Sequence, residues 1–383
     1  MTGPFCEKIP VYQAGEGGYH VVRIPTLLVA PGGTILAGAE ARHGRGQDWD
    51  DNEIFLRRSE DGGKTWQEPV RIASNATYGG GPLSNFAMIA DAATGEVHAL
   101  FCYRYSRVYV LRSADDGKTW SPPREISAVL EEYRRRYPWV VIATGPGHGL
   151  QLRNGRLIIP LWMSDGNGYD RTALRPGHRP SDVGLIYSDD HGATWRCGDF
   201  AARTTDRFRY PSETAAVELS DGSVLFNMRN EGKEHRRLVT VSADGATGWS
   251  EPAFDEALLE PVCLSSMVRL SWPAQGRSRV LFANPATTER LTRPPNHPAC
   301  DRKNLTVRLS YDECKSWPVG KTLEAGPSGY SDLQVTQDGT ILCLYEGGGA
   351  LNGSAVQHQG LLLARFNLEW LTDGRDSLTR EPQ

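Results

Sequence analysis

The sequence predicts an all-β fold, a six-bladed β-propeller that forms one domain over residues 1–383. Three observations lead to this prediction: an octet that recurs along the chain, short apolar runs before each copy, and a large share of turn-forming residues. The chain contains 41 Gly and 24 Pro, which fill 65 of its 383 positions. That share exceeds the usual value of about 12%, and these residues are spread along the chain as many tight turns require.

The recurring octet has the pattern Ser-x-Asp-x-Gly-x-Thr-Trp. Its copies begin at Ser59, Ser113, Ser188, Ser242 and Ser310. The first three are intact, the fourth has its Gly and Thr displaced, and the fifth has Cys in place of Gly. Ser and Asp side chains can bond nearby backbone N–H groups, Gly allows a positive φ, and Trp packs back onto the sheet. We therefore interpret the octets as hairpin turns, and their Asp residues as structural rather than catalytic.

Short apolar runs come directly before the octets, at residues 53–56, 108–111, 183–187, 238–241 and 305–308. Such runs, followed by turn residues, predict strands. The octets recur at a mean interval of about 63 residues, so the chain holds about six units. A unit of that length accommodates four short strands, which is one propeller blade. Residues 128–136 are the best helix candidate, and we expect them to form an insertion between blades.

Charge and cysteine content exclude several classes of protein. The formal net charge is −4 without a basic block, which argues against a nucleic-acid partner. No run approaches 18 apolar residues, so no integral membrane segment is expected. Residues 1–10 lack the apolar core of a secretory signal, and the seven cysteines form no CxxC pair. These features predict no metal site and a cytoplasmic location, with a secreted mature form as the alternative.

Candidate site residues should come singly from several blades, because propeller loops converge on the central channel. One such residue is Arg23, which lies between apolar residues and would be costly to bury without a partner. Polar residues outside the octets also gather in four other segments: 39–51, 211–237, 301–305 and 329–346.

Together these segments resemble the sialidases. The octets resemble the Asp boxes of that family, and residues 22–25 (Val-Arg-Ile-Pro) resemble its Arg-Ile-Pro signature. Residues 48–51 are similar to its acid/base loop, and residues 329–333 to its nucleophile segment. The resemblance runs from about Arg23 to Trp370. It implies a six-bladed propeller that hydrolyses terminal α-ketosidic sialic acids with retention. The partner would be a sialylated oligosaccharide, glycoprotein or glycolipid, and no cofactor would be needed.

The resemblance also implies roles for individual residues. Arg23, Arg237 and Arg302 would bind the substrate carboxylate, with Arg237 preferred to Arg236 because it precedes Ser242 by five residues. Tyr330 would be the nucleophile, Glu213 its general base and Asp48 the acid/base, with Asp50 and Asp51 as rivals. Glu346 would orient Arg23, and Glu40 and Arg42 would lie on the pocket wall.

The chemistry of a sialic acid suits these residue types. Its carboxylate sits on the anomeric carbon, and guanidinium groups bind carboxylates bidentately at any working pH. A phenol can attack that carbon without the repulsion that a carboxylate nucleophile would meet. Because the ordinary pKa of tyrosine is near 10, it needs a general base within hydrogen-bond reach. An elevated pKa at Asp48 would favour its action as an acid.

Three alternatives to hydrolysis of sialic acids stay open at this point. The same site could act on a related ulosonic acid of the Kdn or Kdo type, or transfer the sugar as a trans-sialidase does. A third alternative is a non-catalytic propeller that binds glycans or proteins. The joint presence of Tyr330, Glu213 and Asp48 with the arginines argues against the third.

Overall fold

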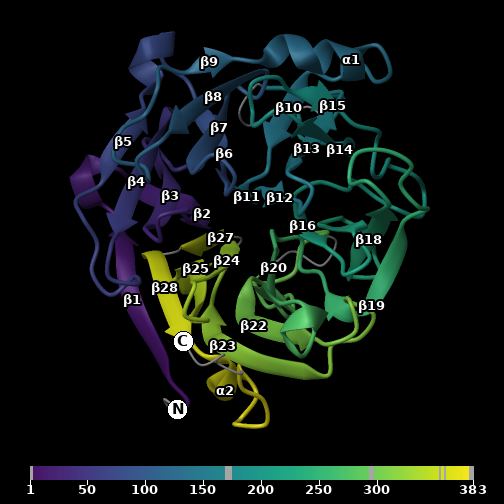
Figure 1. Ribbon diagram of the computed structural model, residues 1–383. Coiled ribbons are helices and arrows are strands. Elements are labelled where there is room, and N and C mark those ends of the chain that lie inside the picture. Colours follow the sequence, from purple (N-terminus) through teal and green to yellow (C-terminus); the bar gives the residue numbers. More distant parts are fainter. Residues whose placement is uncertain (1–2, 169–174, 293–296, 353–354, 358, 379–383) are drawn as a thin grey trace.

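Six largely antiparallel sheets of four or five strands surround a central axis, as the sequence predicts (Figure 1). The structure is a computed structural model, and it describes residues 3–168, 175–292, 297–352, 355–357 and 359–378. We number the blades from the N-terminal side and give the strands of each from the axis outward.

Blades 1 to 3 are built from the first half of the chain. Blade 1 contains β2 (Val21–Val29), β3 (Ile35–Arg42), β4 (Asn52–Ser59) and β5 (Val70–Ala73). Blade 2 contains β6 (Leu83–Asp91), β7 (Glu96–Tyr103), β8 (Arg107–Ser113) and β9 (Arg124–Glu125), with β11 (Gly147–His148) parallel to β6. Blade 3 contains β10 (Val141–Thr144), β12 (Leu150–Gln151), β13 (Leu157–Ser164), β14 (Ser181–Ser188) and β15 (Arg196–Cys197).

Blades 4 to 6 follow the same plan. Blade 4 contains β16 (Thr214–Glu218), β17 (Val224–Met228), β18 (Arg236–Ser242) and β19 (Ala253–Leu259). Blade 5 contains β20 (Ser266–Ser271), β21 (Arg279–Pro285), β22 (Lys303–Ser310) and β23 (Val319–Pro327). Blade 6 contains β24 (Ser331–Val335), β25 (Ile341–Gly347), β28 (Gly360–Phe366) and, at its outer edge, β1 (Cys6–Gln13). A separate hairpin joins β26 (Ala350–Asn352) to β27 (Ala355–Gln357).

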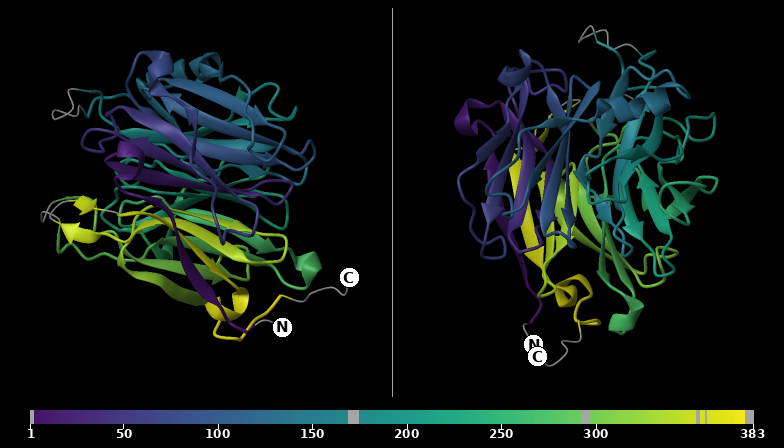
Figure 2. Two further views of the ribbon diagram at one scale, coloured as in Figure 1. Left: turned by 90° about the vertical axis from the view of Figure 1, so that its left-hand side faces the viewer. Right: turned by 45° about the horizontal axis from the view of Figure 1, so that its top comes forward.

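The ring is closed by the N-terminal strand. Strand β1 pairs antiparallel with β28, so the first and last strands of the chain lie side by side (Figure 2). This explains why the octet occurs five times in a six-bladed fold. Each octet follows the third strand of its blade and leads to the fourth, whereas the fourth strand of blade 6 comes from the other end of the chain.

The hydrophobic core lies between the blades rather than at the axis. One cluster packs Ile35 and Leu27 of blade 1 against Leu344 and Leu363 of blade 6. Another packs Phe282 of blade 5 against strands of blade 4. All five octet tryptophans belong to these clusters or pack against them. Each blade is therefore stabilised by burying both of its faces against its neighbours.

The octet turns are hydrogen-bonded as their pattern predicts. In all five, the Ser hydroxyl donates to the carboxylate of the Asp two residues later, and it accepts an N–H group from within the turn. In the fifth, Cys314 takes the glycine position with a φ of 66°. The loss of that glycine therefore strains the backbone without breaking the turn.

In three of the octets, the side chain of the residue after the Asp reaches the preceding blade. The Asp116 carboxylate accepts the Gly32 N–H at 3.1 Å, and His191 Nδ1 lies 2.7 Å from Asp91. Glu313 accepts the Ser220 N–H at 2.7 Å. In each case the contact is with the turn between the two inner strands of that blade, so the octets also connect blades.

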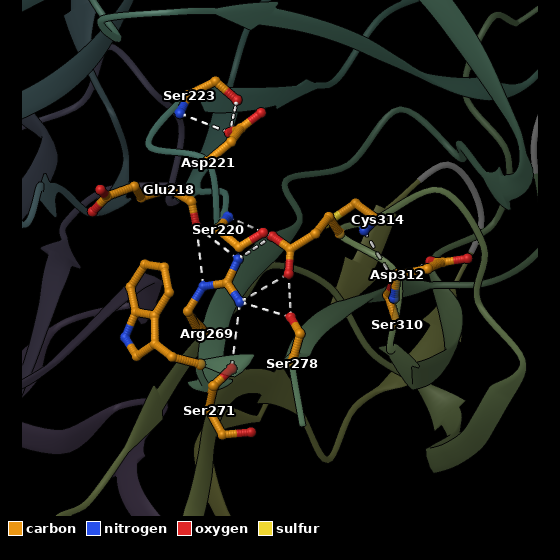
Figure 3. Close-up of polar contacts among 12 residues, drawn as sticks. Glu218, Ser220, Asp221, Ser223, Arg269, Ser271, Ser278, Ser310, Asp312 and Cys314 are labelled. Carbon is orange, nitrogen blue, oxygen red and sulfur yellow. Dashed lines mark hydrogen bonds and ion pairs between the residues drawn. The ribbon is translucent and has the colours of Figure 1, made fainter. Parts of the chain in front are cut away.

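The Glu313 contact also involves Arg269 on β20, which lies among Ser220, Ser278 and Glu218 (Figure 3). Arg269 Nη2 donates to the Glu313 carboxylate at 2.6 Å and to the Glu218 carbonyl oxygen at 2.8 Å. Only 7% of the Arg269 side chain is exposed. Both residues of this ion pair belong to blade 5, and their contacts with Glu218 and Ser220 of blade 4 connect the two blades.

Helices are short. The helix predicted at 128–136 is a 3₁₀ turn (Ser127–Leu130) followed by α1 (Glu131–Arg134), and it lies between blades 2 and 3 as expected. Other 3₁₀ turns occupy Glu16–Gly18, Asn75–Tyr78 and Pro273–Gln275, and α2 (Leu368–Leu371) follows β28. Within the described residues, no helix has the length and apolar character that crossing a membrane requires.

We expect Glu313→Ala to lower the free energy of unfolding by about 2–3 kcal/mol, because it leaves Arg269 buried without its partner. Urea denaturation followed by tryptophan fluorescence measures this difference. Glu251→Ala, at an exposed glutamate, is the control. Equal unfolding midpoints for the two variants would contradict a bridging role for Glu313.

Candidate active site

A cavity opens where inner strands and loops of several blades meet. Seven of the nine predicted site residues line it: Arg23, Glu40, Arg42, Asp48, Glu213, Arg302 and Tyr330. The structure thus brings together residues separated by up to about 300 positions in the sequence. The other two predicted residues, Glu346 and Arg237, lie outside its lining.

Arg23 on β2 forms an ion pair with Glu346 on β25, which fixes the position of its side chain. The Nε and Nη2 groups of Arg23 donate to the two carboxylate oxygens at 3.0 and 3.1 Å, which is a bidentate pair. The same carboxylate accepts the backbone N–H groups of Ile24 and Tyr330, each at 3.1 Å. Ile24 has a φ of 60°, an unfavourable value for a β-branched residue. This conformation turns the strand at the pocket, and the hydrogen bond from the Ile24 N–H group to Glu346 helps to offset its cost.

Tyr330 precedes β24 and contacts two charged groups from blade 4. Its hydroxyl donates to one Glu213 oxygen through a short hydrogen bond, and Arg229 Nη1 donates to that hydroxyl at 2.8 Å. Arg229 Nη1 also donates to the other Glu213 oxygen at 2.7 Å. Burial and the Glu213 charge raise the pKa of Tyr330 above its ordinary value, against the effect of Arg229 and Arg302. Tyr330 therefore becomes a phenolate only by transferring its proton to a neighbour.

Arg302 completes this side of the pocket. Its Nη2 group donates to the Val262 carbonyl oxygen at 2.8 Å, and its guanidinium lies 5.0 Å from the centre of the Tyr330 ring. Among the described residues, Arg23, Arg229 and Arg302 each keep at least one guanidinium nitrogen without a hydrogen-bond partner. Three guanidinium groups with unused donors beside one cavity can bind a carboxylate.

The structure corrects the prediction that Arg237 belongs to this group. Arg237 is fully buried away from the cavity, and its Nη1 group pairs with Glu260. Its other nitrogens donate to Asn227 and Ser265, so all of them are occupied. Arg229 lies at the pocket instead.

Hairpin register, rather than spacing to the octet, is the signal that identifies Arg229. Strands β16 and β17 pair Thr214 with Met228 across the turn at Asp221, so the next pair outward is Glu213 with Arg229. Counting residues outward from that turn would have placed Arg229 beside Glu213 from the sequence alone.

Asp48 also lines the pocket and is held by Arg42. Arg42 Nη1 donates to Asp48 Oδ1 at 2.8 Å, and its Nε and Nη2 groups donate to Glu40 at 2.9 and 2.6 Å. The rivals are used elsewhere: Asp50 accepts backbone N–H groups of its own loop, and Asp51 accepts the Gly81 N–H. Asp48 is the one of the three that lines the cavity.

The pKa of Asp48 departs from its ordinary value in the direction opposite to the expected one. Close packing around the carboxyl would raise its pKa, but the charges of Arg42 and Arg23 outweigh this and lower it. The carboxyl group projects into the pocket, with 48% of its side chain exposed. Asp48 is therefore ionised over the whole physiological range in this state.

Aromatic residues that the sequence analysis missed complete the pocket wall. Tyr105, Trp162 and His178 line it, and Trp49 packs against Tyr105 with ring centres 4.8 Å apart. They come from separate loops and strands, and no shared spacing or motif marks them in the sequence.

A polar cluster below the pocket connects the strands that carry the site residues. Asp332, two residues after Tyr330, accepts the Leu27 N–H at 2.8 Å and the Ser266 hydroxyl at 2.9 Å. His148 Nδ1 lies 2.6 Å from the same carboxylate. His148 therefore has a structural role as a partner of Asp332, and it does not line the pocket.

Comparison with known proteins gives consistent matches. Residues 33–343 match the model of the BNR repeat-like domain. The chain is 30% identical to a sialidase of Micromonospora viridifaciens over 388 residues, which cover 93% of this chain and 53% of that protein. It is 26% identical to a sialidase of Bacteroides fragilis, over 88% of this chain and 62% of that protein. The chain thus spans little more than half the length of these two relatives.

A solved structure shares the fold. The Hadza microbial sialidase Hz136 superposes with a TM-score of 0.76 at 24% identity, over 95% of this chain and 69% of that one. At this level of identity, the superposition shows that the two proteins share the arrangement of the blades.

The His148–Asp332 pair makes stability depend on pH. Burial opposes the charged imidazole, but Asp332 outweighs it and raises the pKa of His148. The added stability is therefore complete below about pH 6.5 and is lost as pH rises through the raised pKa. We expect His148→Gln to cost more at pH 5.5 than at pH 9 in urea denaturation. His20→Gln, at an exposed histidine, is the control, and an equal cost at both pH values for His148→Gln would refute the linkage.

Proposed function

The chain belongs to the family of the BNR repeat-like domain and is similar to sialidases, and on that premise we propose that it is an exo-α-sialidase. It would hydrolyse terminal α-ketosidic sialic acids of glycans with retention, through Tyr330 as nucleophile. One observation carries this proposal: a buried tyrosine hydroxyl bonded to Glu213, beside three arginines with unused donors. A protein that only bound the sugar would need the arginines but not the tyrosine–glutamate pair.

Substrate binding starts with the carboxylate. Arg23, Arg229 and Arg302 would donate charge-assisted hydrogen bonds to its two oxygens, which fixes the anomeric carbon next to Tyr330. Glu346 keeps the Arg23 fork in place, so less conformational entropy is lost on binding. The formal net charge of −4 would repel an anion at long range, and this local group of guanidinium charges opposes that repulsion.

The first chemical step would form a glycosyl–tyrosine bond. Glu213 takes the proton of the Tyr330 hydroxyl as the phenolic oxygen attacks the anomeric carbon. The bond to the leaving oxygen breaks, and its electron pair takes a proton from Asp48. The nearby Arg229 and Arg302 charges favour the phenolate character that develops on Tyr330.

Asp48 must gain a proton before this step, although its pKa is low without substrate. A bound carboxylate would offset the charge of Arg23, and the sugar would exclude water from the pocket. Both changes raise the pKa of a carboxyl group. In the second step Asp48 takes a proton from water, whose oxygen attacks the anomeric carbon and releases Tyr330, and Glu213 returns the phenolic proton.

We expect the protein to release the fluorophore from the 4-methylumbelliferyl α-ketoside of N-acetylneuraminic acid between pH 4 and pH 8. Proton NMR during the reaction should show the α-anomer of the free sugar first, because two displacements retain configuration. Release of the β-anomer first would contradict the tyrosine nucleophile. The Kdn ketoside and an added acceptor sugar, run in parallel, distinguish hydrolysis of sialic acid from the related activities.

We expect Tyr330→Phe to lower kcat by about 100-fold or more while substrate binding persists, because the variant lacks the nucleophile. Saturation-transfer NMR with sialyllactose measures the binding. Unchanged turnover in this variant would favour the non-catalytic alternative.

The two candidate arginines of blade 4 should respond differently to the same substitution. Arg229→Lys should raise KM by about 10- to 100-fold, because a charged hydrogen bond to the substrate contributes about 1.5–3 kcal/mol. Arg237→Lys should leave KM within about threefold and lower the unfolding midpoint in urea, since it breaks a buried pair. A large KM effect confined to Arg237→Lys would restore the original assignment.

A further inference from the structure

His178 is a pocket residue with no role in the mechanism above. It precedes β14 and lines the cavity. Its ring is enclosed by three aromatic side chains, with ring centres 4.7 Å away for Tyr105, 5.2 Å for Trp162 and 5.9 Å for Trp49. These rings come from three different blades or their loops, so the position of the imidazole depends on the assembled pocket.

The imidazole faces the oxygen of Asp48 that Arg42 leaves unused. Arg42 bonds to Oδ1 of Asp48 at 2.8 Å, whereas His178 Nδ1 lies 4.0 Å from Oδ2. That separation is longer than a hydrogen bond, but a small rotation of either side chain would close it. Hydrogen bonds of catalytic groups are often long in the free enzyme and shorten in the substrate complex.

The other imidazole nitrogen has no comparable neighbour. Within the described residues, Nε2 of His178 is buried and has no hydrogen-bond partner. A second proton would therefore place an unsatisfied charged donor among aromatic rings, at a considerable cost. In agreement with this, burial lowers the pKa of His178, as do the charges of Arg179 and Arg229, against those of Asp48 and Glu213. The lowered pKa favours the neutral imidazole, and its single proton would then lie on Nδ1, the nitrogen that faces a carboxylate.

We propose that His178 is a positioning residue for Asp48, whose Nδ1–H group donates to Oδ2 once that oxygen has given its proton to the leaving group. The inference rests on the proposed function, because it assigns Asp48 as the acid. Arg42 and His178 would then hold the two oxygens separately and keep the carboxyl group aimed at the glycosidic oxygen. The donated hydrogen bond would also stabilise the negative charge that develops on Asp48 during proton transfer.

The dependence on the leaving group tests this proposal. An aryl ketoside such as the 4-methylumbelliferyl derivative leaves as a weakly basic phenolate and needs little acid assistance, whereas the sugar alkoxide released from sialyllactose needs much. We expect His178→Phe, which keeps a ring among the aromatic neighbours, to lower kcat on sialyllactose by about 10-fold or more and on the aryl ketoside by less than about threefold.

A second variant separates the hydrogen bond from packing. His178→Asn places an amide nitrogen near the position of Nδ1, so it should recover activity on sialyllactose to within about threefold of the unmodified protein. His20→Phe is the matched control, because it makes the same change at an exposed histidine outside the pocket. Equal losses on the two substrates, or an Asn variant no better than the Phe variant, would overturn the proposal.

A measurement without substrate keeps the inference distinct from the proposed activity. Long-range ¹H–¹⁵N spectra of protein labelled with [¹⁵N]histidine report which imidazole nitrogen carries the proton, and His178→Asn assigns the signal. We expect the Nδ1–H form for His178, and a clear shift of its signal in Asp48→Asn. An Nε2–H form that Asp48→Asn leaves unchanged would overturn the role of His178 even in an active sialidase. If the protein cleaves neither substrate, the proposed function fails while this result still decides whether His178 and Asp48 interact.

Discussion

The buried carboxylate of Glu346 is the contact on which the arrangement of the site depends. It binds the Arg23 side chain and the backbone N–H groups of Ile24 and Tyr330. These groups belong to blade 1 and blade 6, which pack against each other where β1 closes the ring against β28. A buried charge needs several compensating donors, so Glu346 requires all three groups at once. The contacts with Glu346 therefore bring Arg23 and Tyr330 close together. They also stabilise the unfavourable backbone conformation of Ile24.

The arginines of this propeller differ in how completely the protein satisfies them. Arg237 has a partner for each nitrogen and is sealed from the pocket, so its charge serves the packing of blades 4 and 5. Arg23, Arg229 and Arg302 have some of their donors bonded and the cavity in front of them. Partial satisfaction keeps each side chain in position and leaves binding capacity for a ligand. Residue type does not separate the two groups, but burial and the count of partners both do.

Each octet contains positions that form the turn in every copy and one position whose contacts differ between copies. The Ser and Asp positions bond within the turn in all five copies, including the one in which Cys replaces Gly. The residue after the Asp differs between copies, yet in three of them its side chain contacts the preceding blade. Asp116, His191 and Glu313 are chemically unlike because each meets a different turn. The consensus therefore predicts the turn, whereas the bridge between blades depends on the neighbour that each copy faces.

The sequence by itself determined the repeat, the third strand of five blades and the number of blades, because hairpin turns and strand patterns are local. Its resemblance to the sialidases supplied seven of the residues that line the pocket. The tertiary structure decided what depends on distant partners. Closure by β1 could not be read from spacing, since it pairs the two ends of the chain. The choice of Arg229 over Arg237 and of Asp48 over its neighbours followed from which side chains the blades had already paired. The low pKa of Asp48 and the enclosure of His178 arise from charges and rings of several blades, whose distances only the folded ring sets.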